Sequence, residues 1–176
     1  TVLTIDTTKP TISITSPSAD VCLNHRDFNI TGTTTDTNYN YTNISVYNST
    51  GTLLFSTLNY STNWQTNYTV PYDGNYTINA TGYDNASNSN STKINICIDT
   101  TYPSIQFSAD TLVDNSYRNQ NFIYVNVSVT EINFGNITFR LYNSTALMNE
   151  TNYTTQTYNI NWTNLNPNDY YFYNVT

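Results

Sequence analysis

The triplet Asn-x-Ser/Thr recurs along this chain, often in the polar, apolar, polar order of a half-buried β-strand. We count about 17 such triplets. In an extended strand, successive side chains point to opposite faces, so Asn and Ser or Thr face outward while the middle residue faces inward. Asn43–Ser45 and Asn136–Thr138 are examples, with Ile44 and Ile137 as the inward residues. The pattern predicts β-sheet with a polar but uncharged outer face.

Each triplet is also an acceptor motif for N-linked glycans, which a protein receives on a secretory route. The frequencies of Asn and of Ser plus Thr account for roughly half of the triplets. Two interpretations stay open: glycosylation at several sites, or a polar strand face that merely matches the motif. The candidate acceptors are Asn29, Asn40, Asn43, Asn48, Asn59, Asn67, Asn75, Asn79, Asn85, Asn90, Asn126, Asn136, Asn143, Asn149, Asn152, Asn161 and Asn174.

Composition narrows the class of protein. With 176 residues, the chain has room for one large or two small domains. Charged residues make up 10% of the chain, and its net charge is −7. Five Lys and Arg residues in total are too few for a basic surface, which argues against nucleic acid as a partner. No apolar run has the length of a membrane span, and no signal peptide is recognisable. We therefore expect a mature product or an excerpt of a longer exported protein.

A long internal repeat sets the domain organisation. The segment Ile5–Ile12 returns as Ile98–Ile105, about 93 residues later, and Tyr47–Thr50 returns as Tyr142–Thr145. This period is too long for a solenoid and suits a β-sandwich of immunoglobulin size. No stretch has a helical period, so the fold class expected is all-β.

Within the first repeat, short alternating segments follow one another between Gly, Pro, Asn and Asp residues. About seven strands result, the number typical of an immunoglobulin-like sandwich. We expect them near residues 11–16, 27–35, 42–49, 52–58, 63–70, 75–83 and 92–98. The expected domains are 9–99 and 100–176, after a segment 1–8 that matches the last strand of such a domain and the junction behind it.

By the same alignment, the second immunoglobulin-like domain lacks its own last strand, which leaves an open sheet edge. Two explanations are open. The chain is a window on a longer tandem array, or each subunit donates residues 1–6 to complete the sheet of its neighbour. Donation of this kind does not close on itself and would build a head-to-tail homopolymer. The partner expected in both cases is another unit of the same kind.

Cys22 and Cys97 are the two cysteines of the chain. Alternation directs both side chains to an outer face, where the segment before the second strand runs beside the last strand. A disulfide is expected there, as in proteins of oxidising compartments. The alternatives are two free thiols or a metal ion bound by both cysteines. His25 is the one histidine that could serve as a further ligand of such a metal. We expect no metal site at the cysteines.

The stretch Gly74–Asn88, followed by Ile98–Pro103, resembles the end of the Ig-like repeats of large bacterial and archaeal cell-surface proteins. Its Asn-, Thr- and Tyr-rich character is most similar to the archaeal variant. The resemblance covers nearly the whole chain and implies an immunoglobulin-like fold at an extracellular surface, with no specific activity. Tyr76 and Tyr171 stand where such folds have a tyrosine corner.

Residues that carry catalysis are not gathered in the sequence, so we expect no enzyme. His25 reads as a surface residue, and Trp64 and Trp162 read as core residues of the fifth strand. Acidic residues near the expected domain ends suit either a junction Ca²⁺ site or ordinary turns. These acids are Asp6, Asp36, Asp84, Asp99 and Glu131. No cofactor besides glycans is expected, and Ca²⁺ stays an open alternative.

The function expected is that of a structural extracellular module of a surface filament, stalk or envelope layer. The alternative is an adhesin or glycan-binding surface protein, and an accessory domain of a secreted hydrolase is a third class. A bare cluster of aromatic residues without neighbouring acceptor asparagines would favour the adhesin. The tyrosines to follow are Tyr39, Tyr41, Tyr72 and Tyr83.

Overall fold

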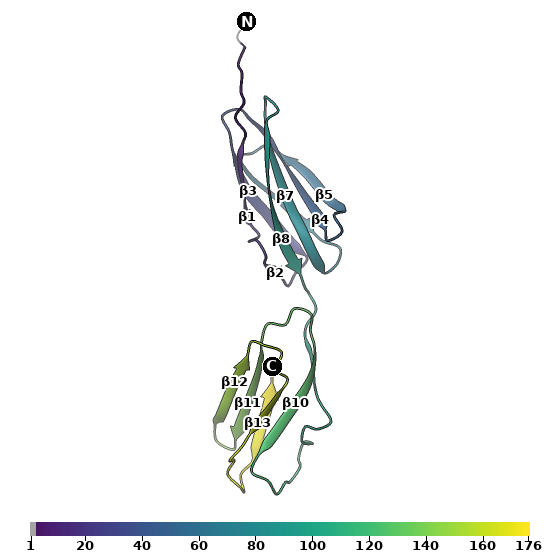
Figure 1. Ribbon diagram of the computed structural model, residues 1–176, viewed down its shortest axis with the longest axis vertical. Helices are drawn as coiled ribbons and strands as arrows, with labels where there is room; N and C mark the ends of the chain where they lie inside the picture. The colour runs from purple at the N-terminus through teal and green to yellow at the C-terminus, as the bar shows by residue number, and fades with distance from the viewer. Residues whose placement is uncertain (1–2) are drawn as a thin grey trace. The chain divides into compact units, whose positions relative to one another are not determined.

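The computed structural model describes residues 3–176 of the chain, and the regular elements of that part are β-strands (Figure 1). The chain divides into two compact units, Thr1–Thr101 and Tyr102–Thr176, called domain 1 and domain 2 here. Each domain has two sets of paired strands that enclose one hydrophobic core. The prediction of an all-β fold with tandem β-sandwiches is therefore confirmed.

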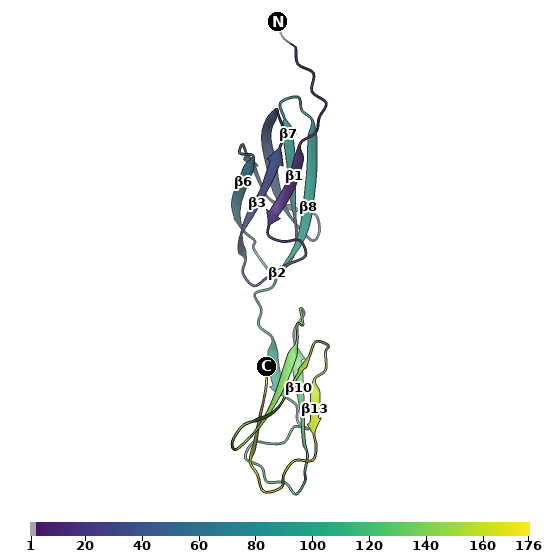
Figure 2. The same ribbon diagram turned by 90° about the vertical axis from the view of Figure 1, so that its left-hand side faces the viewer.

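Domain 1 pairs a three-stranded sheet, in the order β1-β3-β6, with a five-stranded sheet, in the order β2-β8-β7-β4-β5 (Figure 2). All pairs are antiparallel except β2 with β8. The strands are β1 (Thr11–Ser16), β2 (Cys22–Leu23), β3 (Asp27–Thr35), β4 (Tyr39–Asn48), β5 (Leu53–Asn59), β6 (Asn63–Thr69), β7 (Gly74–Asp84) and β8 (Ser89–Ile98). The strands expected from the alternation are all present, and β2 is an addition to them.

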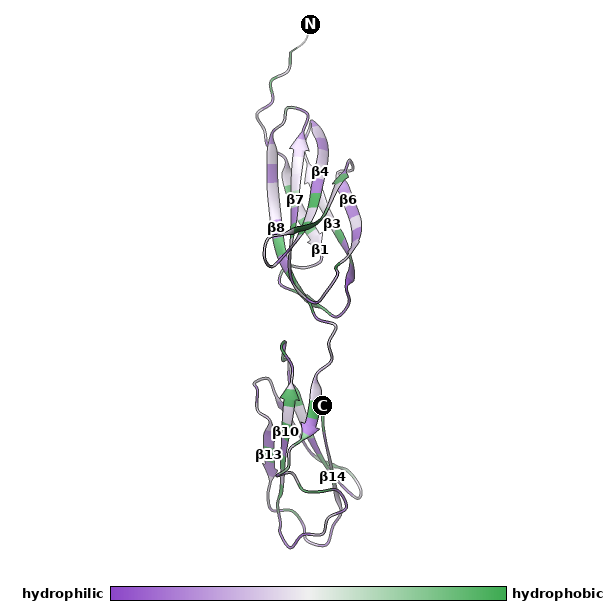
Figure 3. Cartoon of the chain, turned by 90° about the vertical axis from the view of Figure 1, so that its right-hand side faces the viewer, coloured by the Kyte–Doolittle hydropathy of each residue, from purple (hydrophilic) through white to green (hydrophobic). Residues whose placement is uncertain are grey.

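The alternation of side chains in domain 1 is the one that the triplets predict. In β7, Tyr76, Ile78 and Ala80 are buried, and the residues between them are more exposed. The same alternation is visible as interleaved hydrophobic and hydrophilic bands along the strands (Figure 3). It is not universal, because Tyr60, the middle residue of one triplet, lies on the surface.

Domain 2 has a smaller set of strands around its own core. Its sheets have the orders β13-β10-β9 and β12-β11-β14. The strands are β9 (Ser104–Phe107), β10 (Ile123–Thr130), β11 (Ile137–Asn143), β12 (Leu147–Tyr153), β13 (Asn159–Trp162) and β14 (Tyr171–Val175). Val125, Phe139, Leu141 and Trp162 are buried at its centre. Trp162 therefore fills the core of domain 2, as Trp64 does in domain 1.

The two domains repeat the same strand pairing. In domain 1, Asn48 of β4 lies opposite Tyr76 of β7, and in domain 2, Asn143 of β11 lies opposite Tyr171 of β14. Both asparagines accept hydrogen bonds from the turn that follows them, Asn48 from the amide of Thr50 at 3.1 Å among others. Strand β14 is thus the counterpart of β7, and β11 is the counterpart of β4.

Both predicted tyrosine corners are present. The hydroxyl of Tyr76 donates a hydrogen bond of 2.5 Å to the carbonyl oxygen of Tyr72. The hydroxyl of Tyr171 donates one of 3.2 Å to the carbonyl oxygen of Asn166. In each case the ring packs into the core while its polar end is satisfied by the chain just upstream.

The segment before β1 is not part of a sheet. Residues 3–10 form no strand in the structure, and Leu3 and Ile5 are exposed. The expected strand-like segment 1–8 therefore has no partner strand within domain 1, and its residues Thr1 and Val2 lie outside the described part of the chain.

Candidate functional site

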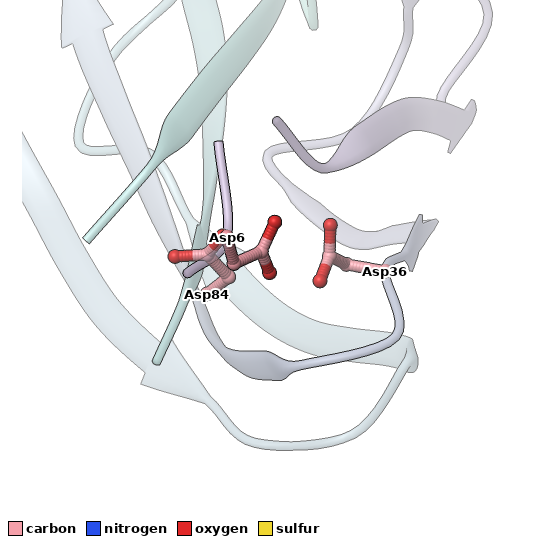
Figure 4. A group of neighbouring side chains, drawn as sticks. All are labelled: Asp6, Asp36 and Asp84. Carbon is pink, nitrogen blue, oxygen red and sulfur yellow. The ribbon is translucent and has the colours of Figure 1, made fainter. Parts of the chain in front are cut away.

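Three aspartates from distant parts of domain 1 meet at one place (Figure 4). Asp6 belongs to the segment before β1, Asp36 follows β3, and Asp84 ends β7. One carboxylate oxygen from each lies within 4.8 Å of the others. Among the acidic residues, histidines and cysteines of residues 3–176, these three aspartates are the ones that lie close enough together to hold a metal ion. Asp99 and Glu131, the other two candidates of the sequence, are not part of it.

Amide groups surround these carboxylates. The side-chain amide of Asn38 donates 2.8 Å to Asp6, and the backbone amide of Asn38 donates 2.7 Å to Asp36. The side-chain amide of Asn88 donates 2.8 Å to Asp84 and 3.0 Å to the backbone carbonyl of Asp6. The hydrogen bond from Asn38, joined by one from the amide of Thr8, holds the pKa of Asp6 below its ordinary value.

This arrangement can act in two ways. Asp6, Asp36 and Asp84 are the residues that could hold a cation, because carboxylate oxygens are ligands of Ca²⁺. Each carboxylate also accepts hydrogen bonds from the protein itself, so the cluster joins the segment around Asp6 to domain 1. Asp84 is 2% exposed, and both of its oxygens accept from Asn88.

Asp73 connects the segment that leaves domain 1 to the body of that domain, a role that the sequence did not reveal. It accepts hydrogen bonds from the backbone amide of Thr100 at 2.8 Å and from the hydroxyls of Thr100 and Thr101. Arg26 forms an ion pair with it at 2.9 Å. These contacts, the amide of Thr100 foremost, hold the pKa of Asp73 below its ordinary value.

The disulfide expected between Cys22 and Cys97 is present. The two residues lie opposite each other on the parallel strands β2 and β8. The bond fastens the short β2 to the edge of the five-stranded sheet and closes a loop with a sequence separation of 75. No free thiol is left in the described part of the chain, which removes the alternative of a metal pair.

None of the candidate acceptor asparagines is buried. In one group the side chain is exposed and its Nδ2 donates no hydrogen bond within residues 3–176. This group is Asn29, Asn67, Asn75, Asn85, Asn136, Asn149, Asn152, Asn161 and Asn174. In a second group Nδ2 donates a hydrogen bond within the protein: Asn48, Asn59, Asn79, Asn90 and Asn126. The members of the first group are the best placed to carry a sugar.

The four tyrosines named for the adhesin alternative, Tyr39, Tyr41, Tyr72 and Tyr83, do not form one bare cluster. The rings of Tyr41 and Tyr83 stack at a centroid distance of 4.8 Å, and Tyr60 lies 6.1 Å from Tyr41. Tyr39 directs its hydroxyl to backbone carbonyls, and Tyr72 packs on Tyr76 instead. Acceptor asparagines precede two rings of the stack, at Asn40 and Asn59. A glycan at either position would cover the aromatic surface.

His25, the single histidine, is exposed and contacts the side chain of Asn24. This position agrees with the expectation of a surface residue. Residues 3–176 hold no helix with the length and hydrophobicity needed to span a bilayer.

The sequence matches no family profile. It also matches no curated protein sequence. Among solved structures, the fibronectin(III)-like modules of Clostridium thermocellum CbhA match with a TM-score of 0.46 and 15% identity, over 94% of this chain and 85% of that one. An engineered protein matches with a TM-score of 0.44 and 16% identity, over 52% of this chain. The tetra-tandem repeat of a large adhesion protein matches with a TM-score of 0.39 and 22% identity, over 91% of this chain.

The chain spans only part of the length of two of these proteins, 20% of the engineered protein and 41% of the adhesion protein fragment. Likeness at this level concerns the β-sandwich architecture and carries no activity with it.

Proposed function

We propose that this chain is a non-enzymatic structural module of an extracellular surface assembly, such as a filament, stalk or envelope layer, with N-linked glycans on its outer faces. The observation that carries the proposal is that the asparagine and the middle residue of a triplet lie in different environments. Their asparagines lie at the surface of both domains, while middle residues such as Ile44, Tyr76 and Ile137 fill the cores. Sugar can therefore be attached to the strands without disturbing their packing.

The disulfide supports an extracellular location. Disulfides persist in oxidising environments and are rare where thiols are kept reduced. The bond between Cys22 and Cys97 fastens β2, a strand of two residues, to β8 at the edge of the five-stranded sheet. A disulfide used in this way suits a protein that works outside the cell.

The way in which domain 1 holds its two ends supports a mechanical role. Asp6, through Asn38 and Asn88, fastens the segment that enters the domain. Asp73, through Thr100, fastens the segment that leaves it. Tension applied along the chain would reach the paired strands through these hydrogen bonds. Proline in each junction, at 10 and 103, further restricts the local backbone.

An intact-mass measurement of the native protein, before and after removal of N-glycans, tests the proposal. We expect the mass to fall by several glycans, and an unchanged mass would contradict it. Peptide mapping should then find Asn29 and Asn67 occupied more fully than Asn48 and Asn126, whose Nδ2 atoms are engaged in hydrogen bonds. Equal occupancy at all sites would show that folded geometry does not guide attachment.

The adhesin alternative has one observation in its favour, the exposed Tyr60 beside the stacked Tyr41 and Tyr83. Aromatic rings of this kind provide apolar contact area for a ligand. Binding of the chain to an array of glycans, lost on Tyr60→Ser and retained on Tyr102→Ser, would support it. Tyr102 is a matched control because it is also exposed and lies outside the stack.

A further inference from the structure

The sheet β12-β11-β14 of domain 2 has an edge at β14 that no strand covers in the described part of the chain. Its counterpart in domain 1, β7, is paired on both sides, with β4 on one and β8 on the other. Domain 1 is therefore a template for what the edge of β14 can accept.

The backbone of β14 presents hydrogen-bonding groups to that open side. Thr138 and Thr176 exchange two backbone hydrogen bonds, of 2.7 and 3.0 Å. Because such pairs alternate along an antiparallel ladder, the amides and carbonyls of Tyr171, Tyr173 and Val175 point away from β11. In domain 1 the equivalent positions of β7 pair with β8.

Apolar surface beside the same edge is incompletely covered. Strand β1 lies against β8 in domain 1, and its Ile14 is packed against the core there. The counterpart of Ile14 in the repeat is Phe107 of β9, which is 55% exposed. The ring of Phe107 contacts the ring of Tyr173 on the edge strand, at a centroid distance of 5.5 Å. A strand added beside β14 would cover this ring.

The chain also carries a segment of the matching kind. In the repeat, Leu3 and Ile5 correspond to Ile96 and Ile98 of β8. Ile96 and Ile98 are 2% and 1% exposed, whereas Leu3 and Ile5 are 85% and 83% exposed. Two apolar side chains whose counterparts are buried in β8 are therefore exposed to solvent, on a segment that pairs with no strand of domain 1.

We propose that Leu3–Ile5 of a second copy of this chain adds to the open edge of β14 as an antiparallel strand. The register follows from domain 1, where Ile96 lies opposite Tyr76 and Cys97 lies opposite Asn75. Leu3 then lies opposite Tyr171, and Thr4 lies opposite Tyr170. The backbone pairing supplies affinity, and the apolar side chains at alternate positions supply specificity.

The occupant is a second copy because the chain presents both halves of this contact, the strand and the edge. One copy cannot close such a head-to-tail contact, so the copies continue into a filament. This inference rests on the proposed function and specifies how the structural module joins its neighbour.

Self-association of the chain tests the inference. Sedimentation over a range of concentrations should show dimers and longer species, and the Leu3→Gln/Ile5→Gln variant should associate at least about tenfold more weakly, since both side chains lose their burial. Because these residues are exposed in the single copy, the variant keeps its fold. Leu58→Gln, which replaces an exposed apolar side chain of domain 1, is the control and should leave association unchanged.

A cross-link tests the register. A Thr4→Cys variant mixed with a Tyr170→Cys variant should form a disulfide-linked heterodimer, because the two positions form a close, non-hydrogen-bonded pair. The same Thr4→Cys variant mixed with Leu147→Cys, on the opposite edge strand β12, should not. A chain that stays monomeric, association that the Leu3/Ile5 changes leave intact, or equal cross-linking at both edges would overturn the inference. None of these results would alter the mass lost on deglycosylation, so the proposed function is tested separately.

Discussion

The indole Nε1 of Trp64 donates a hydrogen bond of 2.9 Å to the hydroxyl of Thr34 inside domain 1. Thr34 is fully buried, and its hydroxyl also lies 2.7 Å from that of Thr42 on the facing sheet. The tryptophan ring reaches this position because Gly32 has no side chain: a Cβ there would overlap the ring. The pair of Thr34 and Thr42 thus links the two sheets of the sandwich, and the absence of a side chain at Gly32 makes room for the ring that donates to Thr34.

Gly32→Ala should destabilise domain 1 by about 1–3 kcal/mol, because the added methyl overlaps the ring of Trp64 in a packed core. Denaturant unfolding followed by tryptophan fluorescence measures the change. Gly135→Ala is the matched control, since a Cβ at that position meets nothing within 4 Å. Equal stability of the two variants would show that the core at Gly32 has room to spare.

Thr34→Val should cost about 1–3 kcal/mol of unfolding free energy, although valine has nearly the same shape as threonine. The change leaves the buried indole N–H without an acceptor and removes one of the two hydroxyl partners of Thr42, the other being Tyr39. The exposed neighbour Thr35 gives the control variant Thr35→Val, which should unfold like the parent. A parent-like midpoint for Thr34→Val would instead mean that another acceptor reaches the indole.

Replacement of both Cys22 and Cys97 by serine should lower the stability of domain 1 by about 4 kcal/mol on the chain-entropy account, given the loop separation of 75. Thermal unfolding of the parent with and without reductant gives an independent measurement. The double variant should show no response to reductant. A parent-like unfolding midpoint for the variant would mean that the bond is a marker of compartment and adds no stability.

The junction at Asp73 predicts a dependence of stability on pH. The folded-state pKa of Asp73 is lowered, so its contribution is complete above the ordinary aspartate value of 3.8 and is lost as the pH falls through the folded-state pKa. Unfolding midpoints measured from pH 5 downward should therefore fall more steeply for the parent than for Asp73→Asn. Parallel curves would show that the hydrogen bonds from Thr100 do not depend on the charge.

The strands could be predicted from the sequence because alternation has the same period as the pleat. The buried positions Ile44, Val46, Ile78 and Ala80 of domain 1 follow from that period and from the β-branched and aromatic residues around them. The disulfide could be predicted for a related reason, because alternation placed both cysteines on an outer face. The repeat relates Tyr47–Thr50 to Tyr142–Thr145, and the structure pairs the strands at these positions in the same way, β4 with β7 and β11 with β14.

The contacts between loops could not be predicted in this way. The meeting of Asp6, Asp36 and Asp84 depends on where three separate turns end, and no period relates these turns. The contact of Asp73 with Thr100 appears only once β7 and β8 are paired, because this pairing brings the start of β7 beside the end of β8. The rule for triplets also failed at Tyr60, which follows the end of β5, where alternation no longer separates inside from outside.

Immunogold electron microscopy of intact producing cells, with an antibody against domain 1, tests the central claim most directly. The account predicts gold particles on the outer surface, arranged along continuous filaments or across a layer that encloses the cell. Particles confined to the cell interior would contradict a role as an extracellular structural module.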